Sequence, residues 1–411
     1  MSKDEITAVL DSMIQGSPSE SEPSIFKVHT LRSDARDNVY DPKILAIGPY
    51  HHKKSSLQNM EQYKCRYMKQ LLWVNNEQSV DRYVIAAIKM QKRARECYAG
   101  PIDLDENEFI KMMILDGCFL IELFRYYHYQ MLRLANGYDP IFEWGIRDQL
   151  RHDIMLVDNQ LPFFVLNELF NMTNYSGVDL TFLILKFFHR LYLNLSLPNT
   201  IEGRHMQKTD HIVGLIHHNL RGNVGNQTCE NWENISSVSE LREVGIRFEK
   251  AEAEIIFENG QRIMNLMDIK FVNGVLKIPQ LDILSRMESQ FGNLIAYEQN
   301  LPRGRRRYVS DYMFVMHCLL KTSDDAKLLM SHEIIKIWLG DNKDVCDMFK
   351  RLGKNILPSP KFSYSQIFSH VNGWKATPQR KATPWRNYIK NHKKHTLMAA
   401  KRDWVTGISD A

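Results

Sequence analysis

The chain has 411 residues, of which 44% are hydrophobic and 25% are charged, and its formal net charge is +5. These are ordinary values for a globular protein, and the length suits one large domain or two smaller ones. Six scattered cysteines without a CxxC pair exclude a zinc ribbon and a disulfide framework, and favour reduced core thiols. The mild positive charge leaves nucleic acid and anionic lipid open as partners without arguing for either.

The two ends of the chain differ from its middle. Residues 1–24 are rich in Ser, Pro and Glu, which predicts a disordered segment, and they lack the apolar core of a secretory signal. Residues 358–411 are predicted to form a flexible basic tail, which holds nine Lys or Arg between residues 375 and 402. No uncharged apolar run approaches the ~20 residues that span a bilayer. We therefore expect an intracellular protein with a single large domain over residues 25–357.

Five N-x-S/T sequons stand in the middle of the chain, a pattern that would fit a secreted protein. Without a signal peptide they would stay unused, so glycosylation is the less favoured interpretation. The sequon asparagines are Asn171, Asn174, Asn194, Asn226 and Asn234.

Apolar residues recur mainly at helical spacing along the chain. A first helical face starts at Leu57 and includes Lys64. Residues 105–135 open with acids, which suit a helix N-terminus, and their middle is apolar on nearly every side, so they predict a central buried helix. Pro162 suits the first turn of the next helix, which Asp158 or Asn159 could cap. Other helices are predicted over about 79–98, 178–193, 207–220, 285–299 and 310–349.

A small β-structure is predicted between residues 244 and 279. The stretch MDIKFVNGVLKIP alternates on both sides of Asn273-Gly274, a dipeptide typical of a two-residue hairpin. Residues 244–250 could add a strand. The predicted fold class is therefore mainly α (α+β), a multi-helix body with a small antiparallel sheet or hairpin over residues 244–279.

Two carboxylates lie on the predicted central helix. Because a buried carboxylate is costly unless it is paired, Asp116 and Glu122 should each meet a cation or backbone N–H groups. Arg125 and Arg147 are candidate partners, and an acid–base pair for catalysis is the less favoured alternative. Gly117 lowers helix propensity at the same place, which indicates close packing against another backbone.

Histidines form two groups. His51 and His52 follow a Gly-Pro-Tyr turn and point in different directions, so a structural role is favoured over metal binding or catalysis. His211 and His218 are seven residues apart with His217 beside them, a weaker metal-binding pattern than an i, i+4 pair. A polar helix face is the favoured interpretation of this second group.

No complete catalytic or nucleotide-binding motif is present. His332-Glu333 is followed by Lys336 where a zincin has its second histidine. A G-x-S-x-G elbow, a Walker A loop and a G-x-G-x-x-G fingerprint are absent too. We therefore expect no cofactor, no metal site and no catalytic set.

Four arginines crowd one predicted loop, LPRGRRRYVSDY. A solvated turn is favoured, and contact with a phosphate-bearing partner, anionic lipid included, or a nuclear import signal are alternatives. Nucleic-acid binding ranks last, because aromatic residues are not interleaved with the basic ones. The four residues are Arg303, Arg305, Arg306 and Arg307.

Seven ordered stretches resemble one known family. They are IGPYHH with LQNMEQYKCRYM, then MMILDGCFLIELFR, DNQLPFFVLNELF, LREVGIRFEK, MDIKFVNGVLKIP and FGNLIAYEQ. Over about residues 25–355 the chain is similar to the plant domain of unknown function 247 proteins. The resemblance implies that the predicted domain is the family domain and that its signature residues are architectural. These residues are Gly48, Pro49, Tyr50, His51, His52, Asp116, Gly117, Asn159, Gln160 and Pro162.

The resemblance also implies a function. The family is specific to land plants, has no assigned enzymatic activity and includes proteins of grass self-incompatibility loci. For this chain, the resemblance therefore implies a non-enzymatic recognition or signalling protein that acts through unknown protein partners at or near a membrane. An uncharacterised, hydrolase-like enzyme that uses His and Asp residues of the helical body is the alternative.

The C-terminus departs from the family pattern. Family members usually end in a membrane-spanning helix after a Pro-Trp pair. Here Pro384-Trp385 is followed by a basic tail, so a spanning helix is not expected. Contact of this tail with an anionic membrane surface is the alternative route to a membrane.

Overall fold

The computed structural model divides the chain into two compact units. The first unit comprises Met1–Arg221 and Arg286–Val309, and the second comprises Gly222–Ser285 and Ser310–Ala411. The structure describes residues 7, 23–27, 40–131, 141, 143–173, 177–189, 209–220, 232–252, 255–256, 262–263, 266–284, 286–302, 304–338, 340–354, 356 and 358–376.

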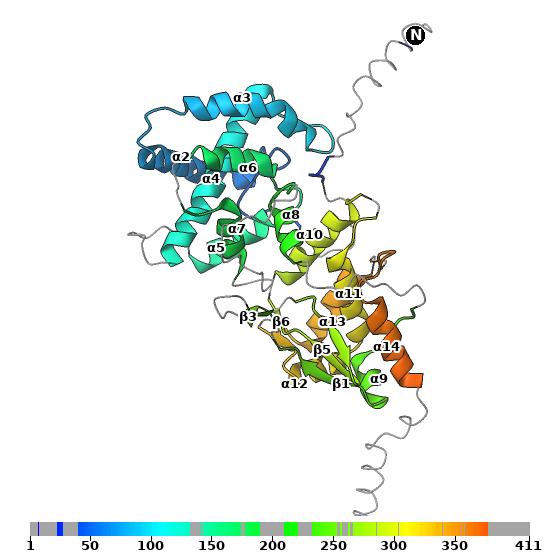
Figure 1. Cartoon of the computed structure of the whole chain (residues 1–411). Coiled ribbons are helices and arrows are strands. Elements are labelled where there is room, and N and C mark those ends of the chain that lie inside the picture. The colour runs from blue at the N-terminus through cyan, green and yellow to red at the C-terminus, as the bar shows by residue number, and fades with distance from the viewer. Residues whose placement is uncertain are drawn as a thin grey trace, which may run out of the picture. The chain divides into compact units, whose positions relative to one another are not determined.

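The first unit is helical and is built around one long helix. Helix α4 (Glu106–Met131) packs against four others, and Figure 1 shows α2, α3 and α6 gathered about it. Its middle is buried on nearly every side, as its continuous apolar sequence requires. The other helices are the 3-10 helix η1 (Ser55–Met60), α2 (Glu61–Val74), α3 (Asp81–Glu96), α5 (Trp144–Ile154), α6 (Phe163–Asn171), α7 (Leu180–His189), α8 (Ile212–Asn219) and α10 (Met287–Gln299).

Gly117 allows α4 and α6 to approach closely. A Cβ atom at this position would lie 2.4 Å from Cδ1 of Leu169, which is on α6. The sequence predicted close packing against a backbone, and that detail is wrong, because the neighbour is a leucine side chain.

The second unit contains the small sheet. Strand β5 (Val275–Ile278) lies between β4 (Lys270–Val272) and β1 (Arg247–Lys250). The predicted hairpin is confirmed: β4 and β5 are antiparallel, and Asn273 and Gly274 have φ angles of 51° and 80°, as a type I′ turn requires. β1 pairs with β5 in parallel, which the expected antiparallel sheet did not include.

Two short strand pairs complete the β-structure. β2 (Ile255–Ile256) pairs antiparallel with β3 (Arg262–Ile263). β6 (Leu281–Ile283) pairs in parallel with β7 (Ile335–Ile337), which is distant from it in sequence. With the helices, this arrangement confirms the mainly α fold class with a small amount of β-structure.

The region of about 310–349, which the sequence predicted to be helical, contains a short strand as well as helices. The segment forms α11 (Tyr308–Leu319), α12 (Ser323–Ser331), strand β7 and α13 (Asn342–Gly353). Capping boxes start two of these helices: Thr322 with Asp325 at α12, and Asp341 with Asp344 at α13. Helix α9 (Val238–Glu243) begins in the same way. Polar caps therefore interrupt an apolar pattern that would otherwise read as one helix.

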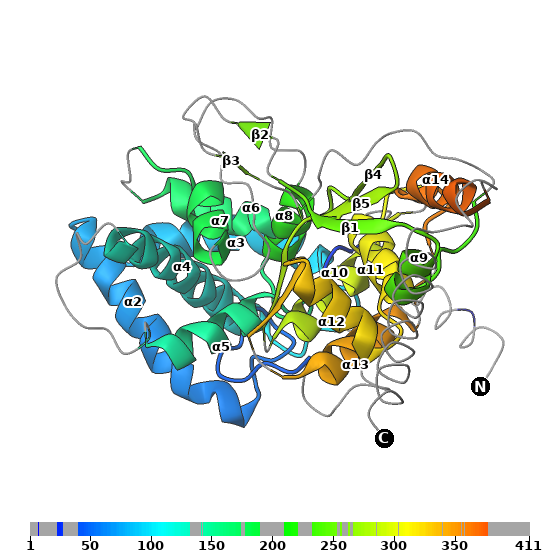
Figure 2. The same cartoon turned by 90° about the horizontal axis from the view of Figure 1, so that it is seen from below.

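Helix α14 (Ser365–Ala376) lies within the stretch that the sequence predicted as tail. Phe362 and Phe368 are buried and contact Trp232 of the same unit, with ring centroids 4.4 and 5.7 Å apart. In Figure 2 α14 runs beside β4, where Trp374 fills the space above Gly274. Residues 358–376 thus contribute to the core, and the rest of the predicted tail lies outside the described residues, as does most of the segment 1–24.

Candidate functional site

Residues 43–48 of the first unit form a stretch outside any helix or strand, and side chains supply hydrogen-bond partners to its backbone. The N–H groups of residues 43, 44 and 45 donate to the carboxylate of Asp153, each over 2.8 Å. Asn159 accepts from the N–H of residue 47 at 2.7 Å and donates to the carbonyl of residue 45 at 3.0 Å. Because buried amides without partners are costly, these two side chains replace a neighbouring strand.

Lys64 and Asp116 hold the end of the same stretch. Asp116 accepts from the Gly48 N–H at 2.8 Å, and its other oxygen lies 2.6 Å from Nζ of Lys64. Lys64 also donates to the Ala46 carbonyl at 2.7 Å and to Glu61 at 2.6 Å. Both side chains of the pair are fully buried. We call the set Lys64, Asp116, Asp153, Asn159 and Gln160 the signature network.

The charges of this network stabilise one another. Burial raises the pKa of Asp116, and the Lys64 ammonium and the Gly48 N–H oppose that rise. Burial lowers the pKa of Lys64, but the charges of Asp116 and Glu61 outweigh burial, so the net shift is upward. Lys64 therefore stays protonated. The sequence offered Arg125 and Arg147 as candidate partners of Asp116 and Glu122. Arg125 pairs with Glu122, which confirms that part of the prediction, whereas the partner of Asp116 is Lys64.

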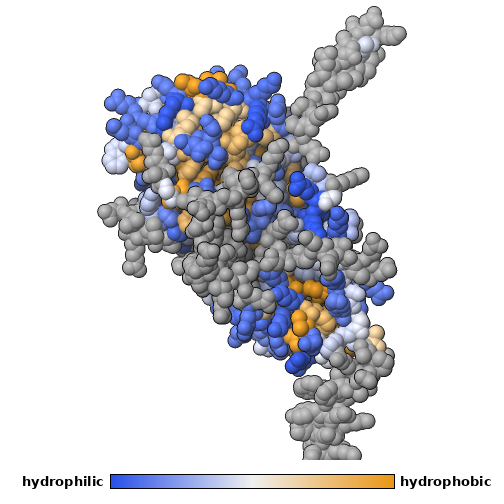
Figure 3. Space-filling model, in the orientation of Figure 1, coloured by the Kyte–Doolittle hydropathy of each residue, from blue (hydrophilic) through white to orange (hydrophobic). Residues whose placement is uncertain are grey.

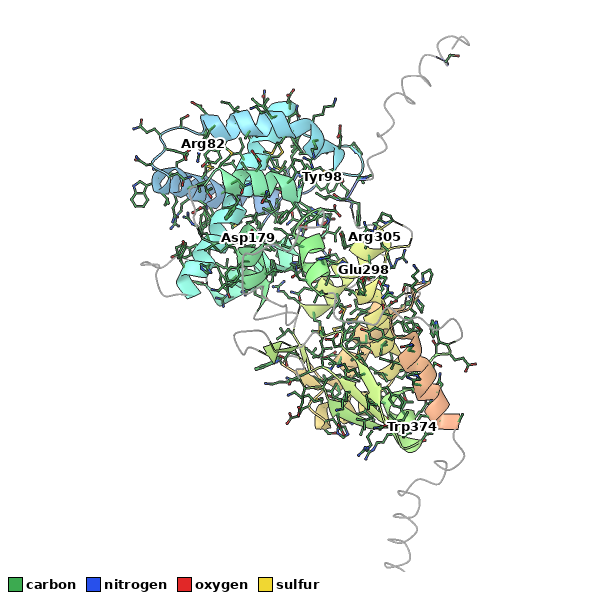
Figure 4. The ribbon with its side chains drawn as sticks, in the orientation of Figure 1. Arg82, Tyr98, Asp179, Glu298, Arg305 and Trp374 are labelled. Atoms are coloured by element: carbon green, nitrogen blue, oxygen red, sulfur yellow. The ribbon has the colours of Figure 1, made fainter. Side chains whose placement is uncertain are left out.

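Gly48 is required by both its conformation and its surroundings. Its φ is +72°, and a Cβ atom there would lie 2.4 Å from the Gln160 carbonyl oxygen and 3.1 Å from the Tyr98 hydroxyl. That hydroxyl donates to the same carbonyl at 3.0 Å, and Tyr98 is labelled in Figure 4. The Gln160 side chain donates to the carbonyls of residues 154 and 156 at 2.6 and 2.8 Å. Gly48 and Gln160 are thus fixed by packing.

The residues after Gly48 also form polar contacts with the rest of the first unit. The Tyr50 hydroxyl donates to the Ala99 carbonyl at 2.7 Å; burial and the nearby Asp158 carboxylate raise the pKa of Tyr50. Nε2 of His51 lies 3.1 Å from Oδ1 of Asp158. The side chain of Gln58 donates to the carbonyl of His52. Among the described residues, no group of three or more His, Cys, Asp or Glu is placed to hold a metal.

The predicted cap of α6 is wrong. Pro162 occupies the N-cap position and no side chain caps the helix. Asp158 and Asn159, which the sequence proposed as caps, bind His51 and residues 43–48 instead. The stretch from Asp153 to Pro162 therefore serves the signature network more than it serves the start of α6.

The second histidine group is not a polar helix face. His211 is fully buried and caps α8 by accepting from the Gly214 N–H at 3.3 Å. His217 is buried too, and its Nε2 lies 2.7 Å from Oε1 of Glu298, a residue labelled in Figure 4. His218 is the exposed member of the group. The prediction failed because α8 is enclosed on most sides.

The arginine loop is only partly described. Arg305, labelled in Figure 4, is exposed, whereas Arg306 and Arg307 are half-buried and Arg303 lies outside the described residues. Of the sequons, Asn171 and Asn234 are exposed and the other three lie outside the described residues. Among the cysteines, Cys118, Cys318 and Cys346 are buried, Cys97 is half-buried, Cys65 is exposed, and Cys229 lies outside the described residues.

The sequence did not single out three residues that hold residues 43–48 in place: Lys64, Asp153 and Tyr98. Lys64 carried a signal, since it is a single cation on an apolar helix face. Asp153 and Tyr98 carried none, because each binds a backbone group far away in sequence: Asp153 contacts amides 108 to 110 positions before it. Only the fold brings such groups together.

The polar groups of the signature network serve the fold. Each of its side chains binds backbone or a buried opposite charge, and each is almost fully enclosed. A general acid or base must reach its substrate within hydrogen-bond distance. The network is therefore arranged to hold residues 43–48 against the helices.

Comparison with known proteins agrees with the seven stretches. A family profile described as "plant protein of unknown function", the domain of unknown function 247, matches residues 25–401. UPF0481 protein At3g47200 of Arabidopsis thaliana is 28% identical over 381 residues, 85% of this chain and 76% of that protein. Putative UPF0481 protein At3g02645 of the same plant is 30% identical over 145 residues, 35% of this chain and 26% of that protein. No solved structure gives a significant match.

The matched region contains the whole signature network, the β4–β5 hairpin and helix α14. Within the described residues, no helix has the length and apolar character needed to cross a bilayer. On the family profile and its agreement with the ordered stretches, this chain belongs to the plant-specific family of domain of unknown function 247 proteins.

Proposed function

We propose that this protein acts by binding other proteins, as a recognition or signalling protein of the self-incompatibility type at or near a membrane, and not by catalysis. One observation carries the proposal: the conspicuous polar residues, Lys64, Asp116 and Asp153 among them, are enclosed and bound to backbone or to each other. A protein whose internal polar groups maintain its shape can vary its surface for recognition. The resemblance to proteins of self-incompatibility loci supports the same reading.

The test is capture of the tagged full-length chain from reproductive and vegetative plant tissue, followed by mass spectrometry. We expect one partner at near-stoichiometric yield, and direct binding of that partner to the purified chain. The matched control is the same tag on UPF0481 protein At3g47200, which shares the family but only 28% identity. A chain that recovers no partner in any tissue, or the same set as the control, would contradict specific recognition.

A hydrolase is the alternative, and one observation favours it. The His51 side chain is 11% exposed, and its Nε2 lies 3.1 Å from the Asp158 carboxylate, a pairing that resembles the histidine base and carboxylate of many hydrolases. We expect the purified chain to hydrolyse an activated ester such as p-nitrophenyl acetate at the same rate with His51→Gln as without it. Turnover that falls roughly 100-fold in His51→Gln, but not in the exposed control His332→Gln, would favour an enzyme.

We place the protein inside the cell, with its basic C-terminus and arginine loop as candidate contacts for anionic partners. Residues after Ala376 carry eight of the nine Lys or Arg counted between residues 375 and 402. Each basic residue near an anionic surface contributes about 1 kcal/mol. Removing residues 377–411, or replacing Arg305, Arg306 and Arg307 with Gln, should therefore weaken binding to phosphatidylserine vesicles, more strongly at low salt. Unchanged binding in both variants would exclude these contacts.

A further inference from the structure

Exposed apolar side chains concentrate where α2 ends and α3 begins. Of the eight large hydrophobic side chains that the described residues expose, five lie between residues 73 and 88. Trp73 is 81% exposed, the highest value of the eight. In Figure 3 orange spheres lie among blue ones at the upper edge of the view, where Figure 1 places α3. The five residues are Trp73, Val74, Val80, Ile85 and Ile88.

Helix α3 presents a mixed apolar and basic stripe on its outer side. Its inner side, which includes Tyr83, Ala87 and Ala94, is buried. The opposite side follows i, i+3, i+4, i+7 spacing, so its four residues form one stripe along the helix. All four are exposed: Ile85, Ile88, Lys89 and Lys92.

Helix α2 repeats this combination at its C-terminal end. Lys69 and Trp73 are one turn apart and both are exposed, whereas Leu71 is buried. We call Lys69, Trp73, Val74, Val80, Ile85, Ile88, Lys89 and Lys92 the α2–α3 corner.

The corner is held in a defined geometry. The Asn75 side chain donates to the Tyr83 hydroxyl at 3.1 Å, and Arg82 donates to the same hydroxyl at 3.0 Å. Arg82 also binds the Met172 carbonyl and Glu77. The exposed side chains therefore stand on a connection that hydrogen bonds fix to the rest of the unit.

Charge in this region is mainly basic. Residues 61–96 contain eight Lys or Arg and four Asp or Glu. Two of the acids are engaged, since Glu61 binds Lys64 and Glu77 binds Arg82. Asp81 and Glu96 are the two exposed acids. The outer surface of the corner thus carries an excess of positive charge beside tryptophan and aliphatic side chains, with Asp81 and Glu96 at the two ends of the α3 stripe.

We propose that the α2–α3 corner docks on an anionic lipid bilayer, with Trp73, Ile85 and Ile88 inserted at the interface and the three lysines against lipid headgroups. Tryptophan favours the membrane interface, and a helix face of aliphatic and basic residues is typical of interfacial binding. The apolar side chains protrude from helix surfaces, and a fluid bilayer accepts them without the complementary pocket that a protein partner would need. The positive charge complements phosphatidylserine.

This docking is independent of the proposed protein partner and of the basic C-terminus. The experiment is co-sedimentation of the full-length chain with vesicles of phosphatidylcholine, alone or mixed with phosphatidylserine. We expect binding to the mixed vesicles. Trp73→Ser with Ile85→Ser, and separately Lys89→Gln with Lys92→Gln, should each weaken it roughly tenfold or more.

Matched controls come from the second unit. Trp338→Ser removes a tryptophan that is 56% exposed, and Lys327→Gln with Lys343→Gln removes two exposed lysines. These controls should bind within about twofold of the unchanged chain. Quenching of tryptophan fluorescence by brominated lipid should fall in Trp73→Phe and persist in Trp338→Phe, because of these two tryptophans only Trp73 belongs to the docking surface.

Three outcomes would overturn the proposal: a full-length chain that stays in solution with mixed vesicles, corner variants that bind as their controls do, or binding that only deletion of residues 377–411 removes. The last result would assign lipid contact to the C-terminus. Capture of the protein partner is measured without lipid, so its success or failure tests the proposed function separately.

Discussion

Lys64 is the residue on which the signature network most depends. Lys64→Met keeps a similar length but leaves the fully buried Asp116 without its counter-charge. Removing one member of a buried ion pair costs about 3–5 kcal/mol, so we expect a loss of that size in the free energy of unfolding by urea. The control is Lys69→Met on the same helix, an exposed position where we expect a change within about 0.5 kcal/mol.

The double variant Lys64→Met with Asp116→Leu distinguishes charge from packing. Because replacing both members of a buried pair with apolar groups removes the unpaired charge, it should recover much of the lost stability. If Lys64→Met and Lys69→Met lowered the free energy of unfolding equally, the Lys64–Asp116 pair would not stabilise the fold.

His211 gives the first unit a defined acid sensitivity. Burial lowers its pKa from 6.5 to about 4, although its bond to the Ser24 carbonyl opposes this. As pH falls below 6.5 the unfolded chain binds the proton before the folded protein does, so stability falls until about pH 4. The stability that His211 contributes is thus full above pH 6.5 and is lost on acidification, by about 3 kcal/mol in all.

His211→Gln should remove this acid-dependent part. The gap in unfolding free energy between wild type and variant should shrink as pH is lowered from 7 to 4 in urea titrations. Ile212→Val, a buried neighbour without a titratable group, should instead lose the same amount at every pH. A gap that stays constant for His211→Gln would contradict the lowered pKa.

At the scale of elements, Gly48 fixes how residues 43–48 pack against residues 153–162. Gly48→Ala must strain a φ of +72° and also push against the Gln160 carbonyl 2.4 Å away. Gly100→Ala is the matched control, because Gly100 has a φ of +96° with nothing within 4 Å of its would-be Cβ. We expect about 1 kcal/mol of destabilisation at Gly100 and at least about 2 kcal/mol more at Gly48, measured by thermal unfolding. Equal losses would mean that strain alone acts at Gly48.

Some elements were readable from the sequence and others were not, for identifiable reasons. The β4–β5 hairpin was predictable because Asn273-Gly274 supplies the two positive φ angles of its turn. Helix α4 was predictable from its apolar length. The start of α12 was not located from the sequence, although Thr322 and Asp325 fit a capping box, because apolar residues recur at helical spacing on both sides of this position.

The signature network was predictable only in part. That Asp116 needs a partner follows from the cost of a buried charge, but the choice of Lys64 depends on how α2 packs against α4. The role of Asp153 as acceptor for three consecutive amides follows from no local pattern. Long-range contacts to backbone are set by the fold, and a single sequence carries no sign of them.

At the scale of the whole molecule, the division into two units implies that each has a core of its own. In the second unit this core includes residues that the sequence assigned to a tail. Asp311 accepts from the N–H groups of Ser359 and Ser363 at 3.0 and 2.9 Å, and Phe362 stacks near Trp232. The folded part of the chain therefore extends beyond residue 357 and includes α14.

Truncation at two positions tests this extension. A chain ending at residue 357 loses Phe362, Phe368 and the partners of Asp311, so a buried carboxylate and an aromatic core become exposed or unpaired. We expect amide hydrogen exchange in residues 232–252 and in α11 to lose at least about 2 kcal/mol of protection, while α4 in the first unit keeps its protection. A chain ending at Ala376 is the control and should match the full chain in both units. If amide hydrogen exchange in the chain ending at residue 357 were as slow as in the control, the second unit would fold without α14, and the prediction would be wrong.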